Sequence, residues 1–202
     1  MPPEMTSDLA TASPAADDAE LIVASLTDTE RFAAIFDRHA ERIHHYVARR
    51  VGTDAAEDIV AETFLTAFRK RSSYDPERPD ARPWLYGIAT TLVARHHRSE
   101  VRYLRALSRT GVDPLPESPA DGVVERITAQ DHMRKLAGAL ATLGRGDRDT
   151  LLLVVWGELT YEEAARALGV PVGTVRSRLN RARRKLRERL GGIDPMKEAR
   201  DG

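Results

Sequence analysis

The stretch that most constrains this chain is residues 159–190, LTYEEAARALGVPVGTVRSRLNRARRKLRERL, which reads as two helices joined by a tight turn. Thr160 is placed to cap the first helix, while Glu163, three residues on, can reach back to the cap amide. Gly169 and Pro171 forbid one continuous helix, because glycine favours a helix end and proline cannot continue one. The pattern predicts a helix-turn-helix.

The second of these helices has an apolar side and a basic side. Apolar residues at helical spacing are predicted to pack on the first helix: Val175, Leu179, Ala182, Leu186 and Leu190. At about 100° per residue, the opposite face carries Gly173, Ser177, Asn180, Arg181 and Arg184, flanked by Thr174 and Arg176. Ser, Asn and Arg can hydrogen-bond base edges, and Arg183, Lys185 and Arg187 suit phosphates.

Eight basic residues and one acid between positions 174 and 189 give this helix a local charge of plus seven. Such a charge run alone equally fits a solvated arginine-rich helix, and the capped helix and glycine turn before it favour DNA binding. The net charge of zero conceals this, because residues 1–30 hold seven acids and no Lys or Arg. That acidic start is unlike an export signal.

The absence of cysteine excludes disulfides, thiolate metal sites and a cysteine nucleophile. The longest fully apolar run, Leu151 to Trp156, is far shorter than the roughly 20 residues that span a bilayer. We expect a soluble cytoplasmic protein without membrane insertion. Six histidines, at 39, 44, 45, 96, 97 and 132, lack the spacing of a metal site such as H-E-x-x-H, so neither a metal nor another cofactor is expected.

Helical periodicity divides the chain into two small all-α domains. An acidic lead at 1–28 is predicted to be disordered. Residues 29–105 form one helical domain, with helices over about 29–51, from Asp54 onward, and from Pro83 to 105. Three prolines and two glycines make 106–122 a flexible linker. Residues 123–191 form the helix-turn-helix domain, including a buried helix at 151–156, and 192–202 are a frayed tail.

Three strings in this order resemble the extracytoplasmic-function (ECF) sigma factors of bacterial RNA polymerase. They are DAAEDIVAETFLTAF at 54–68, RPWLYGIATTLVARHHR at 82–98, and LTYEEAARALGVPVGTVRSRLNRARRKL at 159–186. The resemblance covers nearly the whole chain and implies sigma region 2 followed by region 4. It implies a protein that binds core polymerase, recognises promoter DNA at minus-10 and minus-35 elements, and is held inactive by an anti-sigma protein.

The first string is predicted to bind polymerase. Asp54, Glu57, Asp58 and Glu62 place carboxylates on about two helical turns, with Ile59, Phe64, Leu65 and Phe68 as apolar residues directed inward. Carboxylates beside apolar anchors suit a basic, amphipathic partner helix. The resemblance implies docking on a coiled coil of the largest polymerase subunit through Asp58, Glu62 and Phe64. A solvated acidic face on a core helix is the alternative.

The other two strings are predicted to bind DNA. Trp84 and Tyr86 precede a basic run, and aromatic rings beside arginines suit single-stranded DNA, although Trp84 equally suits the core. The resemblance implies minus-10 contacts at Arg82, Trp84, Arg95 and Arg98. It implies minus-35 contacts at Thr174, Arg176, Ser177, Asn180, Arg181 and Arg184.

We therefore expect a dissociable promoter-recognition subunit that performs no bond chemistry. A freestanding helix-turn-helix regulator is the first alternative. It would use residues 29–105 for dimerisation or ligand sensing and bind its operator without polymerase. A metal-dependent hydrolase is the second alternative, and its turnover would require a metal.

Overall fold

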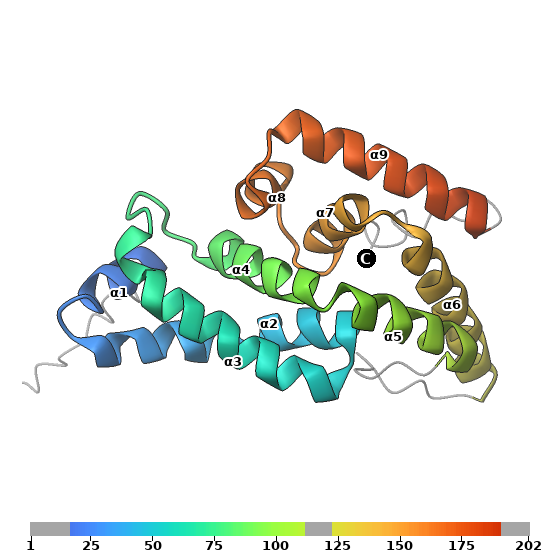
Figure 1. Cartoon of the computed structure of the whole chain (residues 1–202), viewed down its shortest axis with the longest axis horizontal. Coiled ribbons are helices and arrows are strands. Elements are labelled where there is room, and N and C mark those ends of the chain that lie inside the picture. Colours follow the sequence, from blue (N-terminus) through green and yellow to red (C-terminus); the bar gives the residue numbers. More distant parts are fainter. Residues whose placement is uncertain (1–16, 112–122, 191–202) are drawn as a thin grey trace, which may run out of the picture.

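The computed structural model of the chain describes residues 17–111 and 123–190, and this part is helical without a strand (Figure 1). The helices of the first half are α1 (Asp18–Ala24), α2 (Ala33–Val51), α3 (Thr53–Lys70), α4 (Arg82–Arg95) and α5 (His97–Thr110), with short 3-10 turns at Thr29–Phe32 and Arg71–Ser73. Those of the second half are α6 (Val123–Thr142), α7 (Arg145–Val155), α8 (Tyr161–Leu168) and α9 (Val172–Arg189).

Helices α2 and α3 form a hairpin around Gly52. Gly52 has a φ of +90°, which ordinary side chains rarely adopt, and it lies against the Tyr103 ring. Ile35, Ile43 and Ile59, the last predicted to point inward, are buried between the two helices and α4. Asp54 does not cap α3, because the helix already begins at Thr53 and Asp54 lies in its first turn.

The prediction that residues 1–28 are disordered is wrong for the described part of that segment. Asp17 caps α1 by accepting a hydrogen bond from the Glu20 amide at 2.8 Å, and Leu21 and Ile22 are buried in the core. The buried Asp18 carboxylate also accepts hydrogen bonds from Arg38 and the Ala81 amide. Acid-rich composition concealed a short helix with its own cap and apolar face. Residues 1–16 lie outside the described part.

The predicted helix from Pro83 to 105 is two helices, α4 and α5, that meet at His96. Pro83 does occupy the first turn of α4, as predicted. The second helix continues to Thr110, where Gly111 adopts the left-handed conformation with φ +69°. Residues 106–110 are therefore helical and not linker, because Leu107 extends the buried stripe of α5. Residues 112–122 lie outside the described part.

Helices α6 to α9 form the second unit, whose core contains the predicted stripe. Val175, Leu179, Ala182 and Leu186 are buried against α7 and α8, whereas Leu190 is only partly buried. The predicted apolar helix is α7, in which Leu151 to Leu153 are buried. The frayed tail predicted at 192–202 lies outside the described residues.

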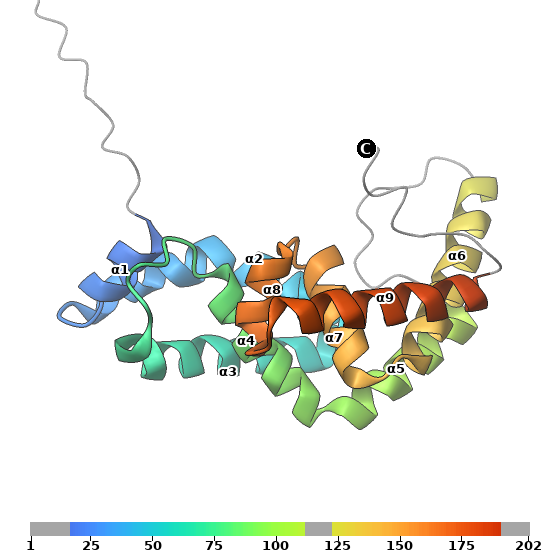
Figure 2. The same ribbon diagram turned by 90° about the horizontal axis from the view of Figure 1, so that it is seen from above.

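The two units pack against each other along their length. Helix α8 lies on α4, α7 approaches α4, and α6 runs beside α5. Figure 1 shows α8 and α7 between α9 and the first unit, and Figure 2, seen from above, shows α9 in front of α7. The interface is close at one point: a Cβ placed on Gly87 of α4 would lie 2.5 Å from the carbonyl oxygen of Ala167 in α8.

Candidate functional site

The helix-turn-helix has the predicted local geometry. The Thr160 hydroxyl accepts a hydrogen bond from the Glu163 amide at 3.2 Å, and the Glu163 carboxylate accepts one from the Thr160 amide at 2.7 Å. Gly169 ends α8 with a φ of +62°, and Pro171 is the N-cap of α9. Two of the orphan amides at the start of α8 are thereby paired, which stabilises the N-terminus of that helix.

The predicted base-reading residues share one face of α9. Arg176, Ser177, Asn180, Arg181 and Arg184 are exposed, and Thr174 is half-buried. Ser177 donates a hydrogen bond to the Thr174 carbonyl at 2.9 Å, and Arg184 lies 3.9 Å from Glu188. Asn180 therefore stands in the middle of an exposed polar face that fits a DNA major groove.

Arg181 has a partner that the sequence did not reveal. Its guanidinium holds the Asp147 carboxylate of α7 with Nη2–Oδ1 and Nε–Oδ1 distances of 3.0 and 3.2 Å. These hydrogen bonds raise the pKa of Arg181. The two residues are 34 positions apart, so no local pattern could pair them. In this arrangement one basic residue of the reading face is already bound to an acid.

Arg183, expected to contact phosphate, lies partly inside the unit. Its Nη2 donates to the Tyr161 hydroxyl at 3.3 Å, across the turn between α8 and α9. Arg187 and Arg189 are exposed in the last turns of the same helix. Exposed cations suit phosphates better than half-buried ones, so Arg187 is better placed than Arg183 for such a contact.

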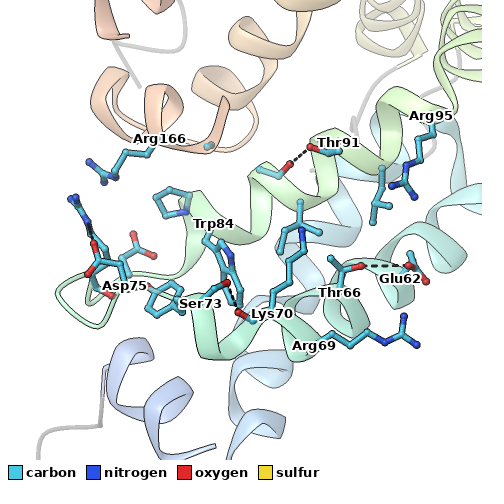
Figure 3. Close-up of a pocket in the computed structure, with 18 residues that line it drawn as sticks. Glu62, Thr66, Arg69, Lys70, Ser73, Asp75, Trp84, Thr91, Arg95 and Arg166 are labelled. Carbon is cyan, nitrogen blue, oxygen red and sulfur yellow. Dashed lines mark hydrogen bonds and ion pairs between the residues drawn. The ribbon is translucent and has the colours of Figure 1, made fainter. Parts of the chain in front are cut away.

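A groove of about 760 Å³ runs beside α4, between the end of α3, the loop after it and α8 (Figure 3). Trp84 lies in its wall with its ring 4.9 Å from the Tyr74 ring, centroid to centroid. Five cations from α3, α4, α8 and the loop before α4 line it beside the acids Glu62, Asp75 and Asp80: Arg69, Lys70, Arg78, Arg95 and Arg166. A ring pair among cations can stack an unpaired base and hold its phosphates. The sequence pointed to Trp84 and Arg95 but not to the cations of α3 and α8.

The predicted minus-10 residues have different environments. Trp84 is half-buried, so its ring is neither a core side chain nor fully exposed. Arg95 and Arg98 are exposed. Arg82 is held by Asp80, with an Nη2–Oδ2 distance of 2.8 Å, and this hydrogen bonding raises its pKa. Tyr86 is a core residue: it is 3% exposed, and its ring packs edge-on against Tyr46. Burial, with a smaller effect of Tyr46, raises the pKa of Tyr86 to about 12.

The acidic surface of α3 also differs from prediction in one respect. Asp58 and Glu62 are exposed, as a docking surface requires. Phe64 is buried and contacts the Phe36 ring of α2, with centroids 4.9 Å apart. Phe64 is therefore directed inward, as predicted, and supports the surface from below, while its contact with polymerase stays a prediction.

The exposed apolar groups beside those acids are Phe36, 46% exposed, and Leu65, 42% exposed. Leu65 was predicted to point inward, but it follows Glu62 by three residues and Asp58 by seven and so shares their face. Two carboxylates next to two exposed apolar side chains form a surface for a basic amphipathic helix.

Within the described residues no group of three or more His, Asp and Glu side chains is arranged to hold a metal ion. The described helices also include none long and apolar enough to cross a membrane.

Sequence comparison places two known families on these two units. Residues 35–103 match Sigma-70 region 2, and residues 133–186 match Sigma-70 region 4. The ECF RNA polymerase sigma factor SigK of Mycolicibacterium vanbaalenii is 30% identical over 178 residues, which cover 86% of this chain and 89% of SigK. The ECF RNA polymerase sigma factor SigC of Mycobacterium tuberculosis is 35% identical over 141 residues, or 70% of this chain and 73% of SigC.

Solved structures agree on the fold. CnrH, determined in complex with the cytosolic domain of CnrY, is 25% identical with a TM-score of 0.60, covering 86% of this chain and 97% of CnrH. The sigma factor RpoE of Bartonella quintana, determined with the anti-sigma factor NepR, is 22% identical with a TM-score of 0.58, covering 79% and 96%.

Proposed function

The chain belongs to the ECF RNA polymerase sigma factors, and we propose that it binds core polymerase through α2 and α3 and places two DNA-binding surfaces on a promoter. The α9 face contacts the minus-35 element, and the groove beside α4 receives the opened minus-10 strand. The observation that carries this is the order of three surfaces along one chain: an acidic and apolar face, an aromatic groove lined by cations, and a capped helix-turn-helix. A freestanding regulator has no need of the first two.

The polymerase-binding surface comprises Asp58 and Glu62 with Phe36 and Leu65, and Phe64 holds the Phe36 ring in place. Its partner is a basic amphipathic helix of the polymerase, because carboxylates steer a basic partner and exposed apolar groups give contact area.

The minus-10 surface comprises Trp84, Arg95 and Arg98, with Arg69 and Lys70 added from the groove wall. Arg82 contributes by holding Asp80 and thereby the loop that ends at α4. The minus-35 surface comprises Thr174, Arg176, Ser177, Asn180, Arg181 and Arg184, with Arg187 on the phosphate backbone. These contacts bind and position DNA, while the chemistry of RNA synthesis belongs to the polymerase, so the chain itself is no enzyme. The proposed functional domains are residues 29–105, together with α1 and the end of α5, and residues 123–191.

A protein that covers one of these surfaces is a further proposed partner. CnrH, which has this fold, was solved with the cytosolic domain of CnrY bound. An anti-sigma protein that occupied the α2 and α3 face would prevent polymerase binding without touching DNA.

The direct test is runoff transcription with purified core polymerase on candidate promoters, with and without this chain. We expect specific transcripts only when both proteins are present. Leu65→Glu places a third carboxylate in the apolar part of the docking face and should reduce core binding at least tenfold. Val23→Glu, at an equally exposed apolar position (46%) on α1, is the matched control and should bind normally. Tight promoter binding by the chain alone would favour the freestanding regulator instead.

A further inference from the structure

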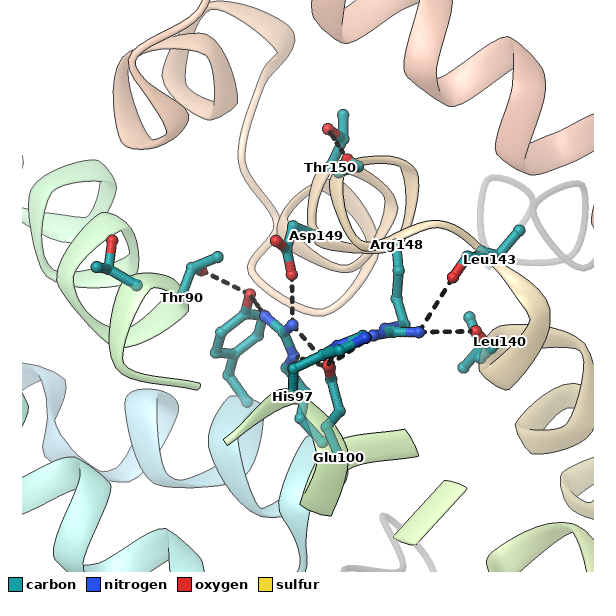
Figure 4. A network of polar contacts seen from close by, with 12 residues as sticks. Thr90, His97, Glu100, Leu140, Leu143, Arg148, Asp149 and Thr150 are labelled. Atoms are coloured by element: carbon teal, nitrogen blue, oxygen red, sulfur yellow. Dashed lines mark hydrogen bonds and ion pairs between the residues drawn. The ribbon is translucent and has the colours of Figure 1, made fainter. Parts of the chain in front are cut away.

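Four charged side chains are buried where α7 meets α2 and α5 (Figure 4). Arg50, Glu100 and Arg148 are 0% exposed, and Asp149 is 5% exposed. Charged groups are almost never buried unless they are paired, because removing a single ion from water costs several kcal/mol. Two arginines and two acids balance, so this cluster is neutral as a whole.

Glu100 stands at the centre of the cluster. Its Oε1 accepts a hydrogen bond from Arg50 at 2.7 Å, and its Oε2 accepts one from Arg148 at 2.8 Å. Arg50 also donates to the Asp149 carboxylate and, at 2.6 Å, to the Tyr46 hydroxyl. Arg148 further donates to the Leu143 carbonyl at 3.2 Å. Each carboxylate is bound by an arginine of the other unit, since Arg50 binds Asp149 and Arg148 binds Glu100.

The cluster joins the two family regions. Arg50 and Glu100 lie in the region 2 match, whereas Arg148 and Asp149 lie in the region 4 match. Helices α5 and α7, which supply Glu100 and Arg148, are separated in sequence by α6. Parting the units would break both cross-unit pairs and expose all four groups to water.

The same closure places α8 at the edge of the minus-10 groove. Gly87 of α4 is so close to the Ala167 carbonyl of α8 that no larger residue fits without a shift. Arg166 and Ala167 of α8 form one wall of the groove that contains Trp84. The helix that begins the helix-turn-helix therefore rests on the helix assigned to single-stranded DNA.

This arrangement cannot reach both promoter elements at once. Elements centred near minus-10 and minus-35 are about 25 base pairs apart, or roughly 85 Å along duplex DNA. Helix α8 packs on both α4 and α9. Packed helices have axes 8–10 Å apart, so α4 and α9 lie within roughly 20 Å of each other where α8 joins them.

We propose that this is a closed state of the free sigma factor, and that Arg50, Glu100, Arg148 and Asp149 form a latch that must open before promoter binding. The effect of the latch on promoter binding rests on the proposed function, whereas the latch itself is a property of the free chain. A charged latch can open reversibly, because all four groups are well hydrated once they are separated. Polymerase, by binding α2 and α3, competes with closure.

Single-molecule energy transfer tests the latch directly. The chain has no cysteine, so Glu41→Cys on α2 and Glu188→Cys on α9, both exposed, give two unique dye positions. We expect high transfer in the free protein and low transfer with core polymerase. Glu100→Gln, which leaves Arg148 without its carboxylate, should lower the closed-to-open ratio about a hundredfold or more. Asp149→Asn, which removes the cross-unit partner of Arg50 but leaves Glu100 and the Tyr46 hydroxyl, should also lower this ratio.

Glu158→Gln is the matched control for the charge change. Glu158 forms an exposed pair between the units, 3.8 Å from Arg42, with its side chain 72% exposed. Its loss should change the closed-to-open ratio less than about fivefold, because exposed pairs are weak. Unchanged transfer in folded Glu100→Gln and Asp149→Asn proteins, or low transfer in the free wild type, overturns the latch.

Gly87→Ala keeps the test decisive even if both charge variants lose helical circular dichroism. It retains all four charges, and alanine favours the helix more than glycine does. The added Cβ wedges α4 away from α8 and should reduce the closed-to-open ratio about tenfold, and unchanged transfer would overturn the closed state. Runoff transcription tests the proposed function separately from the latch. An open free chain that supports transcription refutes only the latch, and a closed chain inactive on every promoter refutes only the proposed function.

Discussion

Replacing Asp147 with asparagine should strengthen promoter binding while slightly weakening the fold. Asp147 holds Arg181 by two Nε contacts and one Nη2 contact, the shortest at 3.0 Å, and the Arg181 side chain is 48% exposed. A partly exposed pair of this kind is worth about 0.2–1 kcal/mol. Asp147→Asn therefore frees a guanidinium of the reading face at little cost and removes a negative charge beside DNA.

The expected gain in affinity follows from that energy. Release of the pair corresponds to roughly a 1.4- to 5-fold tighter complex between holoenzyme and a minus-35 duplex. One additional cation available to phosphates steepens the dependence of log affinity on log salt by at most about 0.9. Asp147 also lies in the first turn of α7, where a carboxylate is favourable, so the unfolding free energy should fall by about 0.3–1 kcal/mol.

Fluorescence anisotropy of holoenzyme on a labelled minus-35 duplex, at several salt concentrations, measures the affinity and its salt dependence. Asp28→Asn is the control, because it removes the same charge from a pair with Arg31 in the first unit, and asparagine still caps a helix. Its affinity should equal that of the wild type. If folded Asp147→Asn binds no more tightly than the wild type, Arg181 is not restrained by this carboxylate.

Three further predictions concern separate parts of the chain. Asn180→Ala should change the preference for minus-35 sequences by about 1–3 kcal/mol at one base pair, whereas Arg187→Ala should weaken binding to all sequences alike. A competition binding assay with several duplexes measures both effects, and two variants that each weaken every sequence equally would contradict this division. Thr160→Ala removes the N-cap side chain of α8 and should lower the free energy of unfolding, measured by urea denaturation, by about 1 kcal/mol. An unchanged denaturation midpoint would show that this cap does not stabilise the fold. Burial opposes ionisation of Asp18, but hydrogen bonds from His39, Ala81 and Arg38 outweigh it and lower its pKa from 3.8 to about 2. The ionised Asp18 therefore contributes about 2 kcal/mol to the free energy of unfolding above pH 4, and this contribution is lost as the pH falls toward 2. Thermal unfolding should show that Asp18→Asn destabilises the protein at pH 7 and has little effect near pH 2.

Local patterns predicted the elements well where cap, turn and apolar stripe agreed. The α8 to α9 segment has all three signals within 30 residues, and its capping box and buried stripe are confirmed. The α4 to α5 break at His96 was missed, since neither proline nor glycine marks it. Helix α1 was missed because a seven-residue helix has too few apolar positions to show a period.

The sites were predicted less completely, because they depend on contacts between distant residues. Phe64 and Leu65 were both predicted to point inward, but adjacent positions on a helix differ by about 100°, and only the packing of α2 shows that Phe64 is buried and Leu65 exposed. The partner of Arg181 and the groove cations of α8 come from other elements. The charged cluster at Glu100 joins residues about 50 positions apart.

The most direct test of promoter recognition is a footprint of one promoter with core polymerase, with this chain, and with both. Permanganate reactivity of thymines reports strand opening, and DNase protection reports the upstream contact. We predict reactive thymines at the minus-10 element and protection at the minus-35 element only when both proteins are present. Protection by the chain alone, or a duplex that stays closed with both proteins on every promoter tried, would contradict the account.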